Sequence, residues 1–213
     1  DGSKSLQESL DMLKIMRDLG IKKWVTTPHI FSDFYPNTPE IIRNKLQEVK
    51  AFVKDAGFDF DIHAAAEYYL DEMFIPKLKN KEILPLGKNH LLFEISYVNP
   101  PDNILSSVFE INVNGYIPVL AHPERYPFWY DKFSEYEKLK EAGVLFQLNI
   151  NSLVGYYGPA AKVIAEKMID RGMIDFVGSD LHGQRHLDAL QKVVSEKSLR
   201  KLMHLGVKNS ALL

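Results

Sequence analysis

The sequence alternates between short apolar segments and longer amphipathic segments along its whole length. Six of the apolar segments have the length and the residue content of buried strands. The expected strands are residues 22–27, 58–67, 90–95, 116–121, 144–150 and 173–179. Each is followed by a segment with helical periodicity. Repeated strand–helix units with mostly apolar strands predict a parallel sheet covered by helices.

Start and stop signals place helices between these strands. Ser5 and Glu8 have the spacing of a capping box, and Thr38 followed by Pro39 is typical of a helix N-terminus. We expect helices over residues 5–20, 39–57, 71–79, 100–115, 131–141 and 159–170, and two more that close the chain. Six such units favour a closed β/α barrel in a single domain over residues 1–213. An open doubly wound sheet is the alternative, although its G-x-G-x-x-G fingerprint does not occur.

The composition excludes several kinds of chemistry. Cysteine is absent, so a cysteine nucleophile, a thiolate metal site and a disulfide framework are all excluded. The formal net charge of −2 argues against nonspecific binding to nucleic acid, which requires a basic surface. No apolar run is long enough to cross a bilayer, and the lack of cysteine fits a reducing compartment. We therefore expect a cytoplasmic protein without a membrane span.

Side chains that can bind metals or phosphate follow the expected strands. In strand order they are His29; Glu67; Glu94; His122, Glu124 and Arg125; Asn149 and Asn151; Asp180 and His182. The C-terminal ends of barrel strands share one face, so these side chains should meet in one bowl. Imidazole and carboxylate without thiolate suit Mn, Fe, Zn or Co. Two or more such ions would activate water for hydrolysis of a phosphate ester without a covalent enzyme intermediate.

Other histidines are interpreted as structural. A single histidine is more often hydrogen-bonded within the fold than bound to a ligand. This interpretation applies to His63, His90, His186 and His204. To explain the strand-end residues in the same way, this structural interpretation would have to apply to each of them separately, although all are expected on one face.

Aromatic residues crowd the loops after three of the strands. They are Phe31, Phe34 and Tyr35; Tyr126, Phe128, Trp129 and Tyr130; and Tyr156 and Tyr157. A rim of rings can hold an aromatic ring or a sugar, and loop packing or an oligomer interface explains the rings equally well. Arg125 and Arg185 are expected phosphate partners because guanidinium binds phosphate oxygens bidentately. We also expect Tyr126 to contact the substrate.

Five short segments of the sequence, taken in chain order, resemble the motifs of a known family. They are TTPH (26–29), AAAE (64–67), FEIS (93–96), AHPER (121–125) and GSDLH (178–182). The chain resembles the PHP (polymerase and histidinol phosphatase) family over nearly its whole length. Within that family it is similar to the manganese-dependent protein-tyrosine phosphatases of bacterial capsule and exopolysaccharide synthesis. The resemblance implies a distorted, TIM-like (β/α)7 barrel of the PHP type.

The resemblance also implies a site for three metal ions, with Mn as the expected ion. Glu67 would bridge two of them. The other expected ligands are Asp180 for the first ion, Glu94 and His122 for the second, and Asp1, His29 and His182 for the third. The family places a His-x-His pair just before the segment that residues 1–3 match. We therefore expect this pair, and the first strand, upstream of residue 1; without the pair the first ion would be held weakly.

The activity that the resemblance implies is hydrolysis of phosphotyrosine in a partner protein. The expected partner is a bacterial tyrosine kinase that regulates polysaccharide synthesis, and Arg125 and Arg185 match positions that contact phosphate. One alternative is a PHP phosphatase of a small-molecule phosphate. Another is a catalytically impaired PHP-like protein that regulates its partners by binding them. The oligomeric state stays open.

Overall fold

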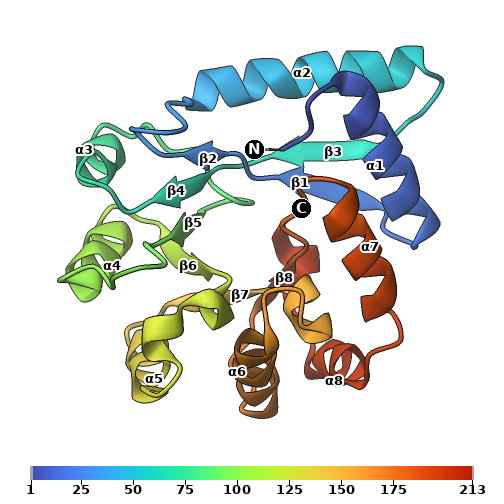
Figure 1. The fold of residues 1–213 in the computed structure, drawn as a ribbon. Helices are drawn as coiled ribbons and strands as arrows, with labels where there is room; N and C mark the ends of the chain where they lie inside the picture. The colour runs from blue at the N-terminus through green and yellow to red at the C-terminus, as the bar shows by residue number, and fades with distance from the viewer. Residues whose placement is uncertain (1, 213) are drawn as a thin grey trace.

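The computed structural model describes residues 2–212 and shows a curved sheet with helices on its outer side (Figure 1). The strand segments are β1 (Lys23–Thr26), β2 (His29–Ile30), β3 (Asp61–Ala64), β4 (Glu67–Tyr69), β5 (His90–Glu94), β6 (Ile117–Ala121), β7 (Leu145–Asn149) and β8 (Phe176–Gly178). All pairs between them are parallel. β1 pairs with β3, and the others form one sheet in the order β2-β4-β5-β6-β7-β8. A doubly wound sheet reverses its strand order, so this sequential order favours the barrel type.

The second expected strand is broken into β3 and β4, and the first is followed by a short segment, β2, that lies beyond its predicted end. Pro28 lies between β1 and β2, and it has no backbone N–H to donate to a neighbouring strand. Pairing resumes on both sides of the break, since Ala65 N donates to Thr26 O at 2.9 Å and Glu67 N donates to Pro28 O at 3.1 Å. Among the described residues, strands occupy all six expected positions, and the sheet does not close. The expected total of seven strands stays a prediction.

The helices lie between the strands as expected. They are α1 (Leu6–Asp18), α2 (Pro39–Asp55), α3 (Phe74–Lys79), α4 (Ile104–Val113), α5 (Ser134–Glu141), α6 (Pro159–Asp170), α7 (Gln184–Val193) and α8 (Lys197–Leu205). Four short 3-10 helices are η1 (Pro123–Arg125), η2 (Pro127–Trp129), η3 (Ile150–Val154) and η4 (Asn209–Leu212). Both expected caps are confirmed: Ser5 Oγ accepts from Glu8 N, and Thr38 Oγ1 accepts from Ile41 N.

The inner face of the sheet is apolar at its base and polar at the C-terminal strand ends. The apolar base consists of Ala65, Leu86, Leu92, Val119, Ala121, Phe176 and Leu212. Side chains alternate between the two faces of a strand, so Glu67 and Glu94 point to the same inner face as Ala65 and Leu92. The strand-end carboxylates therefore lie above this apolar cluster, which forms a floor beneath them.

Asp175 joins two strands to the C-terminal segment at the opposite end of the sheet. Its Oδ2 accepts from Phe146 N at 2.9 Å and from Lys140, and its Oδ1 accepts from Lys208 Nζ at 2.8 Å. Burial opposes ionisation of this carboxyl, but the two lysines and the backbone N–H outweigh it, so the pKa of Asp175 is lowered.

We expect Asp175→Ala to lower the free energy of unfolding by about 1–3 kcal/mol, because the buried N–H of Phe146 would lose its acceptor. A lowered pKa in the folded state means that the carboxylate stabilises the fold above its unfolded pKa. This contribution is lost as pH falls through the folded pKa. Urea unfolding at pH 7 and pH 3 measures both effects. Asp170→Ala, which removes an exposed ion pair with Lys201, is the matched control and should change little. Equal effects of the two substitutions would contradict the prediction.

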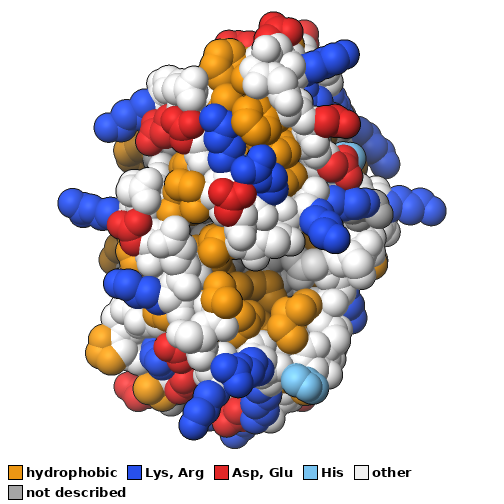
Figure 2. Space-filling model, turned by 90° about the vertical axis from the view of Figure 1, so that its right-hand side faces the viewer, with side chains coloured by type: hydrophobic (Ala, Val, Ile, Leu, Met, Phe, Trp, Pro, Cys, Tyr) orange, Lys and Arg blue, Asp and Glu red, His pale blue; other side chains and the backbone are white. Residues whose placement is uncertain are grey.

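The face on the right of Figure 1 carries α1, α7 and α8. Figure 2 shows acidic, basic and hydrophobic side chains interspersed on it, without a basic stripe. Within residues 2–212, no helix combines the length and the apolar character that a bilayer crossing requires.

Candidate active site

A cavity of about 350 Å³ lies at the C-terminal ends of the strands. Its walls are formed by His29, Phe31, Tyr35, Tyr69, Glu94, Ser96, Tyr97, His122, Arg125, Asp180 and His182. Five of these are expected metal ligands, and a sixth, Glu67, contacts two of the five. The structure thus brings together the expected ligands that it describes. Asp1, the remaining one, lies outside the described residues.

Two buried glutamates lie between two imidazoles. His29 Nδ1 is 3.1 Å from Glu94 Oε1 and 3.6 Å from Glu67 Oε2. On the other side, His122 Nε2 is 3.2 Å from Glu67 Oε1 and 3.6 Å from Glu94 Oε2. Ligand atoms of His29, Glu67 and Glu94 all lie within 4.8 Å of one another, which is close enough to share an ion.

The backbone is strained where it delivers two of the expected ligands. His122 has φ 36° and ψ 56°, and Asp180 has φ 47°. Among the described non-glycine residues, only Lys81 shares a positive φ with them. Such a conformation costs of order 1–3 kcal/mol and persists only where surrounding contacts enforce it. Strain at these two positions is therefore consistent with a functional requirement for their side-chain directions.

Asp180 is held by several groups at the edge of the cavity. Its Oδ2 accepts from Arg125 Nη1 at 2.7 Å and from Asn149 Nδ2 at 3.0 Å. His182 Nδ1 lies 2.8 Å from the Asp180 carbonyl oxygen and 3.5 Å from Oδ1. The ring of His182 stacks near that of His29, with centroids 6.2 Å apart. Asp180 thus connects Arg125 to the imidazole cluster.

The electrostatics of the cluster suit a divalent cation. Burial lowers the pKa of both His29 and His122, but the contacts with Glu94 and Glu67 outweigh it, so both pKa values are raised overall. Burial raises the pKa of Glu67 despite the opposing contact with His122. The carboxylates therefore draw positive charge to this point. Imidazole and carboxylate are also the ligands that borderline metal ions prefer, so these residues fit a metal centre.

Arg125 is stacked between two tyrosines. Its Cζ lies 4.0 Å from the ring centroid of Tyr157 and 4.9 Å from that of Tyr97. The Tyr97 hydroxyl lies over the His122 ring, 3.4 Å from Nδ1 and 3.3 Å from Nε2. The sequence analysis missed Tyr97, although its place three residues after Glu94 matches the pattern that singled out the other loop aromatics.

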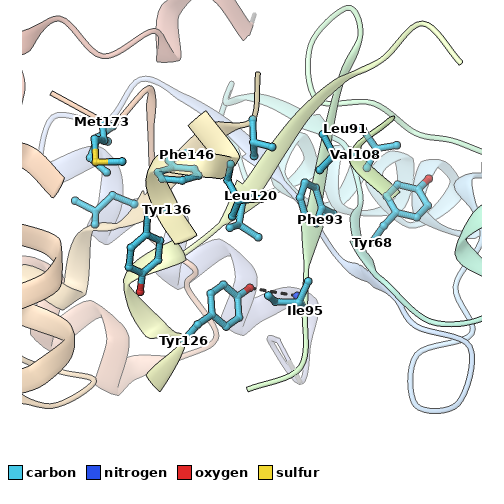
Figure 3. Packing of buried hydrophobic residues seen from close by; sticks show 14 of the residues in the cluster. Tyr68, Leu91, Phe93, Ile95, Val108, Leu120, Tyr126, Tyr136, Phe146 and Met173 are labelled. Carbon is cyan, nitrogen blue, oxygen red and sulfur yellow. Dashed lines mark hydrogen bonds between the residues drawn. The ribbon is translucent and has the colours of Figure 1, made fainter. Parts of the chain in front are cut away.

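The expectation that Tyr126 contacts the substrate does not fit the structure. Tyr126 is fully buried and does not line the cavity. Its hydroxyl accepts from Ile95 N at 3.2 Å (Figure 3). The same hydroxyl donates to Ala121 O, also at 3.2 Å. Trp129 is buried as well, with its ring 5.6 Å from that of Tyr126. Tyr126 and Trp129 therefore pack within the loop behind His122 and do not form part of the expected aromatic rim. Phe31 and Tyr35, by contrast, do line the cavity.

Three other residues that the sequence analysis named lie outside the cavity lining. Arg185 is exposed in the first turn of α7 and does not line the cavity, so its contact with phosphate stays a prediction. Glu124 is fully buried, and its Oε1 accepts from Asn149 N and Ser152 Oγ. It thereby fixes η1 to Asn149, which donates to Asp180. His186, interpreted as structural, accepts from His182 N at 3.2 Å through Nδ1.

Comparison with known proteins gives a consistent assignment. CapC of Staphylococcus aureus is 30% identical over 183 residues, which cover 85% of this chain and 72% of that protein. The tyrosine-protein phosphatase CpsB of Streptococcus pneumoniae is 26% identical, over 95% of this chain and 89% of CpsB. The tyrosine-protein phosphatase YwqE of Bacillus subtilis (strain 168) is 25% identical, over 100% of this chain and 86% of YwqE.

The fold has a close counterpart among solved structures. It superimposes with a TM-score of 0.87 on one from a crystallographic study of YwqE and CpsB, described there as metal-dependent tyrosine phosphatases. The sequence identity is 23%, and the match covers 100% of this chain and 88% of that one. Residues 1–204 match the family model described as "Capsular polysaccharide synthesis, CpsB/CapC". The chain therefore belongs to the CpsB/CapC family of capsular polysaccharide synthesis proteins.

Proposed function

We propose that this chain is a metal-dependent phosphatase that hydrolyses phosphotyrosine in proteins, with residues 1–213 as its phosphatase domain. The observation that carries the proposal is the convergence of three imidazoles, three carboxylates and one guanidinium at a single cavity. The names of the relatives YwqE and CpsB support the same substrate class.

The metal ligands in this proposal are His29, Glu67, Glu94, His122, Asp180 and His182, together with Asp1. When bound, divalent ions at such a site polarise a phosphoryl oxygen and lower the pKa of a water toward neutrality. Mn is the proposed ion, and the donor set also suits Fe, Zn or Co. With no cysteine in the chain, no cysteinyl phosphate can form.

The protein side chains bind and orient the phosphate ester. Arg125 donates to the phosphate oxygens, and its stacking on Tyr97 and Tyr157 fixes the plane of the guanidinium. Phe31 and Tyr35 offer apolar rings to the phenyl group of phosphotyrosine. Burial raises the pKa of Tyr97, so its hydroxyl stays protonated at neutral pH and remains a hydrogen-bond donor beside His122.

The finer parts of the proposal are a bacterial tyrosine kinase as the partner and a cytoplasmic location. Both rest on the family's place in capsular polysaccharide synthesis.

Comparing substrates with Mn present tests the proposed activity. We expect kcat/KM for a phosphotyrosine peptide to exceed that for the matching phosphoserine peptide and for a hexose phosphate by about tenfold or more, since only phosphotyrosine engages the rings. A preference for the hexose phosphate would favour the small-molecule alternative. No hydrolysis of any of the three would favour a regulatory protein that binds without catalysis.

A further inference from the structure

An apolar rim of exposed side chains surrounds one side of the polar cavity. The members of this rim are Phe34, Met73, Tyr97 and Val98, and all are large hydrophobic residues exposed to solvent. Phe34 is 72% exposed and Val98 is 79% exposed. They follow β2, β4 and β5, which are neighbours in the sheet, so three separate loops bring apolar surface to the same edge of the cavity.

The loop that carries Phe34 is firmly held. Phe31 and Tyr35 exchange backbone hydrogen bonds of 3.0 and 2.8 Å across the turn. The Phe31 ring stacks on Tyr69 at 4.1 Å, and Phe34 lies 5.0 Å from Phe31. Both Phe31 and Tyr69 line the cavity. Exposure of Phe34 is therefore a feature of a fixed turn that continues the cavity wall outward.

The same loops are acidic. Asp33 precedes Phe34, Glu72 precedes Met73, and both acids are exposed. Residues 31–38, 70–73 and 95–103 contain no lysine or arginine. Basic side chains contact these loops from outside them: Lys77 of α3 donates to Ser32 Oγ at 2.9 Å, and Arg125 lies over the Tyr97 ring toward the cavity. Whatever covers the rim meets apolar side chains and negative charge.

Phe34, Met73 and Val98 do not line the cavity, so a free phosphomonoester bound there would not need them. A polypeptide that presents phosphotyrosine to the cavity must lay its flanking residues across the surrounding loops. We propose that the apolar rim binds the polypeptide on either side of the phosphotyrosine, and that it selects apolar and neutral or basic flanks over acidic ones. This inference rests on the proposed function and extends it to the sequence around the phosphorylated residue.

The test compares the double variant Phe34→Ser/Val98→Ser with wild type on two substrates. For a phosphotyrosine peptide with leucine and lysine flanks, KM should rise about tenfold or more, because two apolar contacts are lost. Hydrolysis of p-nitrophenyl phosphate should be unchanged, since neither side chain lines the cavity. The control Phe109→Ser/Val163→Ser removes the same two residue types from exposed positions on α4 and α6 and should leave hydrolysis of both substrates unaffected.

Binding is measured separately from turnover. A fluorescent peptide with a nonhydrolysable phosphonate in place of the phosphate should lose affinity for the rim variant, and acidic flanks should weaken its binding to wild type. If the chain hydrolysed neither substrate but both binding effects were observed, the proposed activity would be wrong and the inference about the rim would stand. Equal peptide affinity for wild type and the rim variant would overturn the inference alone. If the variant instead abolished self-association of the chain in sedimentation experiments while peptide binding was unchanged, a second copy would be the occupant and the inference would be wrong.

Discussion

Removal of divalent ions should abolish hydrolysis of an aryl phosphate by this chain, and added Mn should restore it. The chain has no cysteine to act as a nucleophile, and its cavity gathers imidazoles and carboxylates around one point. Metal ions contribute several kcal/mol to such a reaction, which corresponds to a rate loss of roughly a thousandfold or more. Initial rates with p-nitrophenyl phosphate before and after chelation, and after addition of Mn, measure the effect.

Unfolding during chelation would imitate this result, so the fold must be followed at the same time. Because the ligands come from strand ends above an apolar floor, we expect the circular dichroism spectrum to persist without metal. Added Mn should raise the melting temperature, since an ion that binds only the folded state stabilises it. Glu94→Gln should weaken both the reactivation and the thermal shift, whereas Glu82→Gln, at an exposed position outside the cavity, should change neither. Full activity in excess chelator would contradict the metal mechanism.

Most of the fold follows from local sequence rules. Ser5 and Thr38 mark two helix starts because their side chains accept backbone N–H groups, a geometry that depends only on neighbouring residues. The break between β3 and β4 was missed because the alanines at 64–66 continue the apolar pattern through it. Whether the sheet closes depends on pairing between distant strands, on which local patterns carry no information.

The site could be predicted from strand ends because residue parity fixes which face a side chain takes. Glu67 and Glu94 follow inward-facing apolar residues by two positions, and both face the cavity. The rule fails after His122. There the backbone turns through a positive φ and sends Tyr126 into the interior, where its hydroxyl binds Ile95 N and Ala121 O. Beyond such a turn, composition cannot distinguish a ring that lines a cavity from one that packs behind it.

Arg125 should contribute to catalysis through the phosphate, and its removal should have the second large effect. A charge-assisted hydrogen bond is worth about 1.5–3 kcal/mol, so Arg125→Ala should lower kcat/KM by roughly tenfold to a few hundredfold. Arg125→Lys should recover only part of the loss, because an ammonium group neither binds phosphate bidentately nor stacks between Tyr97 and Tyr157. Steady-state kinetics with a phosphotyrosine peptide, with KM and kcat resolved, measure both variants.

The contact with Asp180 gives Arg125 a competing structural explanation. If Arg125 served only to hold this carboxylate, its removal would weaken binding of Mn and would leave KM at saturating Mn unchanged. If it binds phosphate, KM should rise even at saturating Mn, and inorganic phosphate should inhibit the variant less than wild type. Arg171→Ala removes an exposed guanidinium that pairs with Glu137, and it controls for loss of surface charge. In the Arg125→Ala variant, Asn149 still donates to the Asp180 carboxylate, so saturating Mn could still fill the site. If the kinetics of this variant match those of wild type at saturating Mn, Arg125 only positions Asp180 and does not bind phosphate.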